Sequence, residues 1–139
     1  MTDYSRNRSA AWGIAVLRVI VGIVFVAHGA QKLFGFGLAG LAGFLSQQGF
    51  PLPTVAAAVL IATELGGGLA LVLGLFTRWA ALPLAFAMLV ATLTVHLKGG
   101  FFLPHGYEYT LTLLAATIAL ALTGSGRPAL DAVLARRSA

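Results

Sequence analysis

The stretch TVAAAVLIATELGGGLALVLGL, from Thr54 to Leu75, decides what kind of fold this chain can form. An α-helix rises about 1.5 Å per residue, so a run of about twenty apolar residues is long enough to cross the hydrocarbon core of a bilayer. The run contains one charged residue, Glu64, which would be costly to expose to lipid. We therefore predict a membrane-spanning helix that turns Glu64 toward other helices.

Three more apolar blocks flank this segment. They cover residues 11–34, 79–97 and 106–123 of a 139-residue chain in which 59% of the residues are hydrophobic and 9% are charged. Soluble domains carry about 25% charged residues, and the mean hydropathy here is +0.93. This composition excludes an ordinary soluble domain. It predicts an all-α membrane protein with a single domain over residues 1–139, built as a four-transmembrane-helix bundle.

Basic residues gather at one end of these four blocks. Under the positive-inside rule, loops rich in Lys and Arg stay in the cytoplasm. The loop of residues 35–53 contains neither residue, so we expect it on the outer side. Both termini are therefore predicted to be cytoplasmic. The residues on which this prediction depends are Arg6, Arg8, Arg78, Arg127, Arg136 and Arg137.

The first outer loop contains a helical pattern of its own. Leu38, Leu41, Ala42 and Leu45 recur at the spacing of one face of a helix. The pattern predicts a short amphipathic helix that lies in the membrane interface and covers the outer half of the bundle.

Ionisable side chains are concentrated in the outer half of the predicted bundle. Counted from the outer boundary, His28 lies roughly 9 Å deep and Glu64 roughly 15 Å deep. Side chains lean toward the N-terminus of their own helix, so on two antiparallel spans His28 and Glu64 lean toward each other. We predict that they approach within hydrogen-bonding distance or the length of one bridging water, with Lys32 one turn above His28.

These residues predict a polar ligand site, with His28 and Glu64 as its catalytic pair. Gly67 and Gly68 share the face of Glu64, whereas the small residues spaced by four from Ala58 to Gly74 are predicted to pack on a neighbouring helix. Aromatic side chains at the outer side would enclose a ligand ring. The predicted ligand-binding residues are Lys32, Phe34, Gly67, Gly68, His96, Phe101, Phe102, Glu108 and Tyr109.

Structural roles compete with this interpretation at several positions. The Arg18 side chain could extend to the cytoplasmic interface. Glu108 could complement the helix dipole in the first turn of the fourth helix. His96 could be an ordinary interfacial residue, and His28 with Glu64 could form a purely structural buried pair.

The sequence also limits the cofactors and partners. It has no cysteine, so the chain supplies no thiolate, disulfide or iron–sulfur ligand of its own. His28 and His96 differ by roughly 8 Å in depth, which does not suit a shared haem, and no spacing of His, Asp and Glu predicts a metal site. The net charge of +5 comes from basic residues at helix ends, so nucleic acid is not an expected partner.

Four stretches of the chain, taken in order, resemble one known family. They are HGAQKLFGFG (28–37), ELGGGLALVLGLFTR (64–78), GGFFLPHGYEYTL (99–111) and LTGSGRPALD (122–131). Together they resemble the DoxX family of bacterial membrane proteins, over about Ile14 to Asp131. The resemblance implies four spans in the bacterial cytoplasmic (inner) membrane. It also implies a link to quinones, because the broader relatives include a membrane subunit of thiosulfate:quinone oxidoreductase. The lack of cysteine departs from what direct sulfur transfer would need.

Residues and resemblance together lead to a hypothesis for the function. The chain is expected to be a membrane subunit of a redox system, binding a quinone or a similar lipophilic ligand in the outer half of the bundle. It would work with further copies of itself or with a redox partner protein that delivers the electrons. A noncatalytic anchor or assembly subunit is the first alternative. A small transporter or proton path is the second, and with four spans it would require an oligomer.

Overall fold

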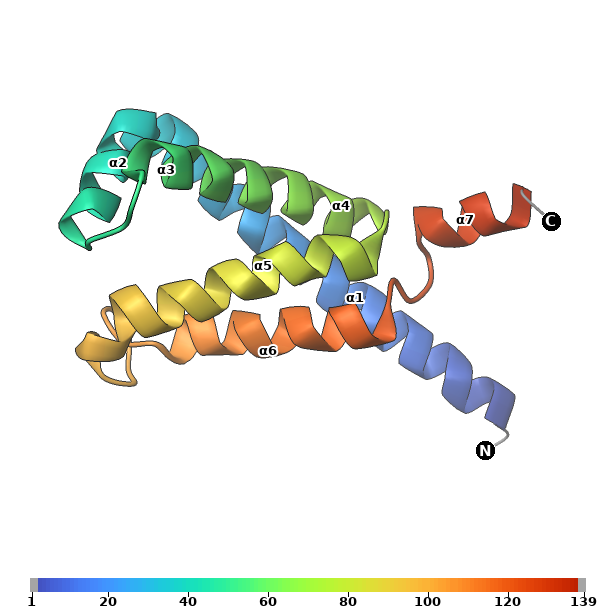
Figure 1. Cartoon of the computed structure of the whole chain (residues 1–139). Coiled ribbons are helices and arrows are strands. Elements are labelled where there is room, and N and C mark those ends of the chain that lie inside the picture. The colour runs from blue at the N-terminus through green and yellow to red at the C-terminus, as the bar shows by residue number, and fades with distance from the viewer. Residues whose placement is uncertain (1–2, 138–139) are drawn as a thin grey trace.

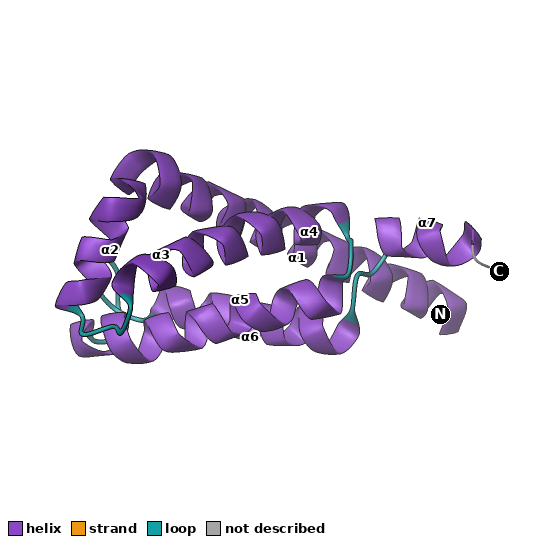
Figure 2. Ribbon diagram, turned by 45° about the horizontal axis from the view of Figure 1, so that its top comes forward, coloured by secondary structure: helices purple, strands orange, loops and turns teal. Residues whose placement is uncertain are grey.

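The computed structural model describes residues 3–137 and the side chains of residues 7–134. This stretch is built of helices and short connections (Figures 1 and 2). The α-helices are α1 (Asp3–Ala30), α2 (Gly37–Gln47), α3 (Pro53–Ala62), α4 (Gly68–Leu73), α5 (Thr77–Ala91), α6 (Glu108–Thr123) and α7 (Leu130–Arg137).

Wider π-helical turns occur at three places along these helices. One, Gln31–Phe36, joins α1 to α2, and another, Thr63–Gly67, joins α3 to α4. The third, Thr92–His96, follows α5 and leads into a 3₁₀ turn at Leu97–Gly99. A π-helical turn bonds each residue to the fifth one along rather than the fourth, so it shifts the helical phase of everything after it.

Three helical segments of the described chain are long and apolar enough to cross a membrane. They are Asn7–Gln47, Pro53–Leu73 and Thr77–Gly99, whereas α6 is apolar but shorter. The prediction of an all-helical membrane protein is confirmed. The fourth predicted block, residues 106–123, begins as a helix only at Glu108. Its first residues belong instead to a tight loop, which is closed by hydrogen bonds such as the one from Tyr107 N to Gly100 O.

The bundle has two distinct ends. The described ends of the chain and the connection from α4 to α5 lie at one of them, which we call the terminal end (Figure 1). Helix α2 and the loop of residues 97–107 lie at the other, the loop end. At the terminal end Gly74 closes α4 with a φ of 69°, a left-handed conformation that suits glycine at a helix C-terminus.

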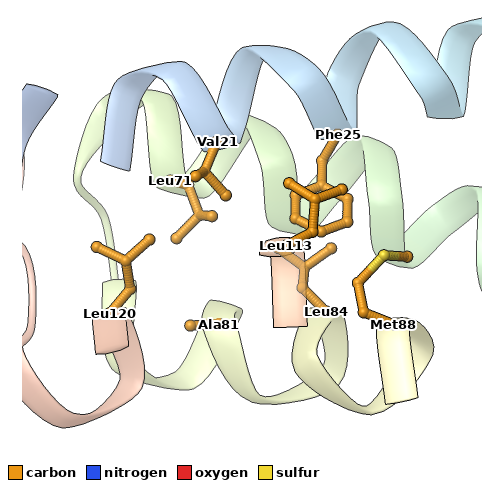
Figure 3. Close-up of a cluster of buried hydrophobic side chains, with 8 residues drawn as sticks. All are labelled: Val21, Phe25, Leu71, Ala81, Leu84, Met88, Leu113 and Leu120. Atoms are coloured by element: carbon orange, nitrogen blue, oxygen red, sulfur yellow. The ribbon is translucent and has the colours of Figure 1, made fainter. Parts of the chain in front are cut away.

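The main core fills the middle of the bundle between α1, α4, α5 and α6 (Figure 3). Helix α1 crosses α4 closely because both present glycine at the crossing. A Cβ on Gly22 would lie 2.7 Å from Gly68 O, and one on Gly68 would lie 2.8 Å from Val26 N. The buried core side chains are Val21, Phe25, Leu71, Ala81, Leu84, Met88, Leu113 and Leu120.

The helix predicted within the first outer loop is present as α2. It turns back from the end of α1 and packs against α3 (Figure 1). The buried face of α2 is formed by Leu41, Ala42 and Leu45, three of the four residues in the predicted pattern, and it meets Ala57 and Ile61 of α3. This second, smaller core holds α2 over the loop end of the bundle.

Arg18 is buried at the terminal end, where it joins three segments of the chain. Its side chain is 2% exposed. Nη1 donates to Leu71 O at 2.6 Å and to Val72 O at 3.1 Å, and Nη2 donates to Pro128 O at 2.7 Å. The last backbone carbonyls of a helix have no hydrogen-bond donor within that helix. Arg18 therefore supplies a donor to two carbonyls at the end of α4. The suggestion that Arg18 extends to the interface is therefore corrected.

In the same region Asp131 accepts hydrogen bonds from the backbone N–H groups at the start of α5. Its carboxylate accepts hydrogen bonds from Phe76 N at 2.8 Å and Thr77 N at 3.4 Å. A negative charge at a helix N-terminus also interacts favourably with the helix dipole. Arg18 and Asp131 thus hold the tight turn between α4 and α5, which sets how the two halves of the bundle meet.

We expect the substitution Arg18→Leu to destabilise the protein by about 2 kcal/mol or more, because it removes the side-chain donor to Val72 O and Pro128 O and one of the two donors to Leu71 O. The matched control is Arg8→Leu, which removes an exposed arginine from the same helix. Thermal unfolding in detergent measures both. Equal unfolding temperatures for the two variants would contradict the assigned role of Arg18.

Candidate functional site

A cavity of about 750 Å³ lies between the helices toward the loop end. Residues of α1, α2, α3, α5 and α6 line it, together with residues of all three π-helical turns. Its size falls within the range of small-molecule sites, about 300–1,000 Å³. Most of the lining is apolar, and the polar members are His28, Lys32, Thr63, Glu64, His96, Tyr109 and Thr110.

The strongest interaction in this cavity is an ion pair between Lys32 and Glu64. Lys32 Nζ lies 2.7 Å from Glu64 Oε2 and 3.0 Å from Oε1. The Glu64 side chain is 2% exposed and that of Lys32 is 19% exposed. An unpaired charge at this depth would be costly, so each residue makes the other tolerable in the bundle. The pair also ties the end of the first span to the middle of the second.

Each ionisable member of the pair sits on a π-helical turn. Lys32 lies in the turn Gln31–Phe36 and Glu64 in the turn Thr63–Gly67. His96, a third ionisable residue of the lining, ends the turn Thr92–His96. Single π-helical turns within α-helices occur frequently at functional sites. The coincidence of all three turns with cavity-lining groups therefore marks this cavity as the candidate site.

A second polar pair links α1 to α6. His28 Nε2 and Tyr109 Oη lie 3.2 Å apart, with the ring centroids 5.7 Å apart. His28 stands four residues before Lys32, and both line the cavity. The polar end of the cavity thus contains an ion pair and a hydrogen-bonded pair that can donate or accept, depending on the tautomer of His28.

The structure gives His28 and Glu64 different partners from the one predicted. Within the described part of the chain no hydrogen bond joins these two side chains directly: Lys32 contacts both carboxylate oxygens of Glu64, and His28 lies beside Tyr109. Both nevertheless line the same cavity, and Glu64 faces the bundle interior. Contact between them through one water stays a prediction.

Five of the predicted site residues line the cavity, and the others lie elsewhere. Phe34 is 83% exposed on the outside of its turn, and Phe102 is 76% exposed in the loop before α6. Phe101 stacks edge-on against Phe102 and Tyr107 in that loop, at centroid distances of 5.3 and 5.4 Å. The predicted residues that do line the cavity are His28, Lys32, Glu64, His96 and Tyr109.

The remaining three predicted residues have structural positions. Glu108 Oε1 accepts a hydrogen bond from Leu103 N at 2.7 Å, which closes the loop ahead of α6. Gly67 and Gly68 pack on other helices, since a Cβ on Gly67 would lie 3.0 Å from Leu84. Conversely, Ala58, Ala62 and Gly66, which were predicted to pack, are exposed. The π-helical turn does not cause this exchange, since Ala58 and Ala62 precede it and the buried residues Ala57, Ile61, Glu64 and Gly68 keep the spacing of a regular helix. The two faces lie opposite each other as predicted, but the bundle packs on the face of Glu64 and leaves these small residues outside.

Several lining aromatics were missed by the sequence reasoning. Phe36 and Phe44 come from the first outer loop, and Phe50 follows α2. Gly40 and Phe44 are four residues apart on α2 and both line the cavity, so they share one face of that helix. Phe36 precedes Gly37, whose φ of 70° interrupts the helix, so helical spacing could have identified Phe44 but not Phe36 or Phe50.

The fold and the cavity define the class of this protein: it is a multi-pass helical membrane protein with ionisable residues around an internal cavity. A family model described as DoxX matches residues 13–97, and the chain belongs to the DoxX family. The match includes Lys32, Glu64 and His96. No solved structure is significantly similar to the chain.

Curated relatives cover nearly the whole chain. It is 40% identical over 125 residues to CatD of Bacillus subtilis, whose name assigns it provisionally to the oxidoreductases, and the match covers 90% of this chain and 89% of CatD. It is 30% identical over 133 residues to the inner membrane protein YqjF of Escherichia coli, with coverage of 90% and 94%. The inner membrane protein YphA of Escherichia coli is 27% identical over 124 residues, with coverage of 85% and 87%. The predicted inner-membrane location is confirmed.

We expect Lys32→Met to destabilise the bundle by on the order of 3 kcal/mol, because it leaves the Glu64 carboxylate buried without its partner. Adding Glu64→Leu to this variant should restore part of the loss, since the double variant has no stranded charge. Lys98→Met, at an exposed lysine, is the control. Unfolding in detergent provides the measurement, and strictly additive effects of the two substitutions would show that the pair does not interact.

Proposed function

We propose that this protein is the membrane subunit of a redox system and that its cavity binds a quinone or a similar lipophilic ligand. The observation that carries the proposal is the cavity itself, in which ionisable and hydroxyl groups meet at one end of an otherwise apolar volume. Sites for small lipophilic molecules have this composition, a mainly apolar wall with a few polar groups that orient the ligand.

Lys32 is the group best placed to orient such a ligand. Its ammonium carries three N–H donors, and the two contacts with Glu64 use part of that capacity. A remaining N–H can donate to a carbonyl oxygen of the ligand, since Lys32 lines the cavity. The apolar wall beside it, which includes Phe25 and Met88, would contact the ring.

His28, Tyr109 and Glu64 would handle protons. Reduction of a quinone to the quinol adds a proton to each carbonyl oxygen as the electrons arrive, and the protein that supplies the electrons is oxidised. Imidazole and carboxylate side chains exchange protons readily. The hydrogen bond between His28 and Tyr109 provides a short path for a proton along one wall of the cavity. The name of CatD, the relative that is 40% identical, supports redox chemistry in this branch of the family.

The electrons would come from a partner. The chain has no cysteine, and the described residues include no group of three His, Cys, Asp or Glu that could hold a metal ion. We therefore assign the electron-donating centre to a second protein. In this arrangement the present chain supplies the ligand site in the membrane and the proton-exchanging groups.

We also propose that the chain has four spans, with both termini in the cytoplasm and the cavity in the outer half of the membrane. Helix α6, with 16 residues, is about 24 Å long, somewhat short of a hydrocarbon core of about 30 Å. Local thinning of the bilayer can accommodate such a helix. The described chain ends share one end of the bundle, as four spans require (Figure 1).

Single-cysteine labelling tests this topology directly, because the chain has no native cysteine. Asn7→Cys lies at the terminal end and Gln47→Cys at the end of α2, and both positions are exposed. A membrane-impermeant maleimide applied to spheroplasts should label Gln47→Cys and leave Asn7→Cys unlabelled until the membrane is permeabilised. Labelling of Asn7→Cys in intact spheroplasts would overturn the proposed orientation.

Quinone binding is tested by extraction and by titration. We expect wild-type protein in mild detergent to carry quinone in near-stoichiometric amount, and decylubiquinone to bind in equilibrium titration. Lys32→Met should weaken that binding at least tenfold, because it removes the proposed donor to the carbonyl. Lys98→Met serves again as the control, since its lysine is exposed and does not line the cavity.

The negative outcome is equally informative. If wild-type protein carries no quinone and titration with both ubiquinone and menaquinone analogues is silent, the proposal fails. The anchor or assembly role would then be favoured, with Lys32 and Glu64 serving only to join helices.

A further inference from the structure

The cavity wall is not closed on all sides. Helices α4 and α5 are joined tightly at the terminal end, and from there α3 and α5 diverge toward the loop end (Figure 1). Helix α3 packs on α2, whereas α5 packs on α6 through core residues such as Leu84 and Leu113. Cavity-lining side chains from α3 and α5 face this gap from its two sides.

Three of these lining residues, Val59, Pro83 and Phe86, are also on the outer surface of the protein. Val59 of α3 is 58% exposed and Phe86 of α5 is 68% exposed, yet both line the cavity. Residues that belong to the cavity and to the surface at once mark an opening between them. Phe36 and Phe44, which are 61% and 42% exposed, meet the same criterion and mark an opening beside α2. Another opening lies sideways, between α3 and α5.

This opening faces lipid rather than water. Val59 and Phe86 lie within the apolar segments Pro53–Leu73 and Thr77–Gly99, each long enough to cross the membrane. Their surface neighbours along the same helices are apolar and exposed, for example Val55 at 57% and Leu82 at 51%. A molecule that enters here comes from the hydrocarbon region of the bilayer.

The opening and the ionisable groups occupy different parts of the cavity. Lys32, Glu64 and His28 come from the first span and from the turn between α3 and α4. The cavity-lining side chains of α3 and α5 near Val59 and Phe86 include Ala56, Leu60 and Ala87, which are apolar. The cavity thus matches an amphiphile whose polar head reaches Lys32 and whose apolar chain extends out between α3 and α5.

We propose that the site selects ligands with a long apolar tail and admits them sideways from the bilayer, with the tail leaving between Val59 and Phe86. This inference rests on the proposed function and deepens it, since it specifies a tailed, membrane-dissolved quinone or a similar amphiphile. A bilayer is as apolar as the tail, so the tail gains little contact energy in the gap. The opening instead allows the head to reach the polar groups while the tail remains in lipid.

The test closes the opening and compares two ligands. Val59→Trp places a large side chain in the gap, and Val55→Trp places the same side chain one turn away on α3, where exposure is similar but the residue does not line the cavity. The probes are decylubiquinone and the same benzoquinone head without a tail. Equilibrium affinities are measured in detergent for both variants and the wild type.

We expect Val59→Trp to weaken binding of decylubiquinone at least tenfold while changing the affinity for the tailless head less than threefold. Val55→Trp should leave both affinities near wild type. Unchanged affinity of Val59→Trp for both ligands would overturn the inference and leave the proposed function standing, as would an equal loss of both. If the wild type binds neither ligand, the proposed function itself fails.

A second measurement does not use the Val59→Trp variant, so its result does not depend on whether that variant folds. A quinone with a nitroxide at the end of its tail is bound to single-cysteine variants that carry a second spin label at Val55, Leu82 or Leu122. The tail label should lie closer to Val55 and Leu82 than to Leu122, which is 72% exposed on α6 and does not line the cavity. A tail label closest to Leu122 would overturn the proposed route.

Discussion

The ion pair between Lys32 and Glu64 is the interaction on which the rest of this structure depends. A carboxylate that is 2% exposed in a membrane-spanning helix needs a partner, and Lys32 Nζ supplies it at 2.7 Å. The pair joins the π-helical turn after α1 to the one between α3 and α4, so it brings together two segments separated by a long stretch of chain. It also leaves a charged, hydrogen-bonding group at the edge of an apolar cavity. Stability and ligand recognition therefore depend on the same two side chains.

The fold follows from the sequence to a large extent. The apolar blocks of about twenty residues predict the membrane helices, and the spacing of Leu41, Ala42 and Leu45 predicts α2, because helix formation in lipid is dictated by length and hydropathy. The role of Arg18 could not be predicted in the same way. Its acceptors, Leu71 O, Val72 O and Pro128 O, are backbone atoms far away in the sequence, and no residue pattern identifies them. Only the packed bundle brings these carbonyls to the guanidinium.

The candidate site was predictable in its ionisable residues and less so in their pairing. His28, Lys32 and Glu64 stand out because placing an ionisable side chain within an apolar membrane segment is energetically unfavourable. Which side chains pair depends on the helical phase of each segment. Three π-helical turns lie along these segments, and no particular residue type marks them in the sequence. In the structure Lys32 takes the position beside Glu64 that the sequence estimate gives to His28, and Gly67 packs against Leu84 rather than facing a ligand, because the face of Glu64 is the one that meets the neighbouring helices. The chain's membership of the DoxX family agrees with its all-helical membrane fold.

The central claim is that the polar end of the cavity, at Lys32 and Glu64, receives the head of a lipophilic ligand. Photolabelling of the protein in membranes with a quinone that carries a photoreactive group on its head ring tests this most directly, with the attachment sites located by peptide mass spectrometry. The account predicts labelling concentrated on peptides around residues 25–36, 59–64 and 109–113, and competition by unmodified quinone. Labelling spread over lipid-facing residues such as Ile20 and Leu122, insensitive to competitor, would contradict it.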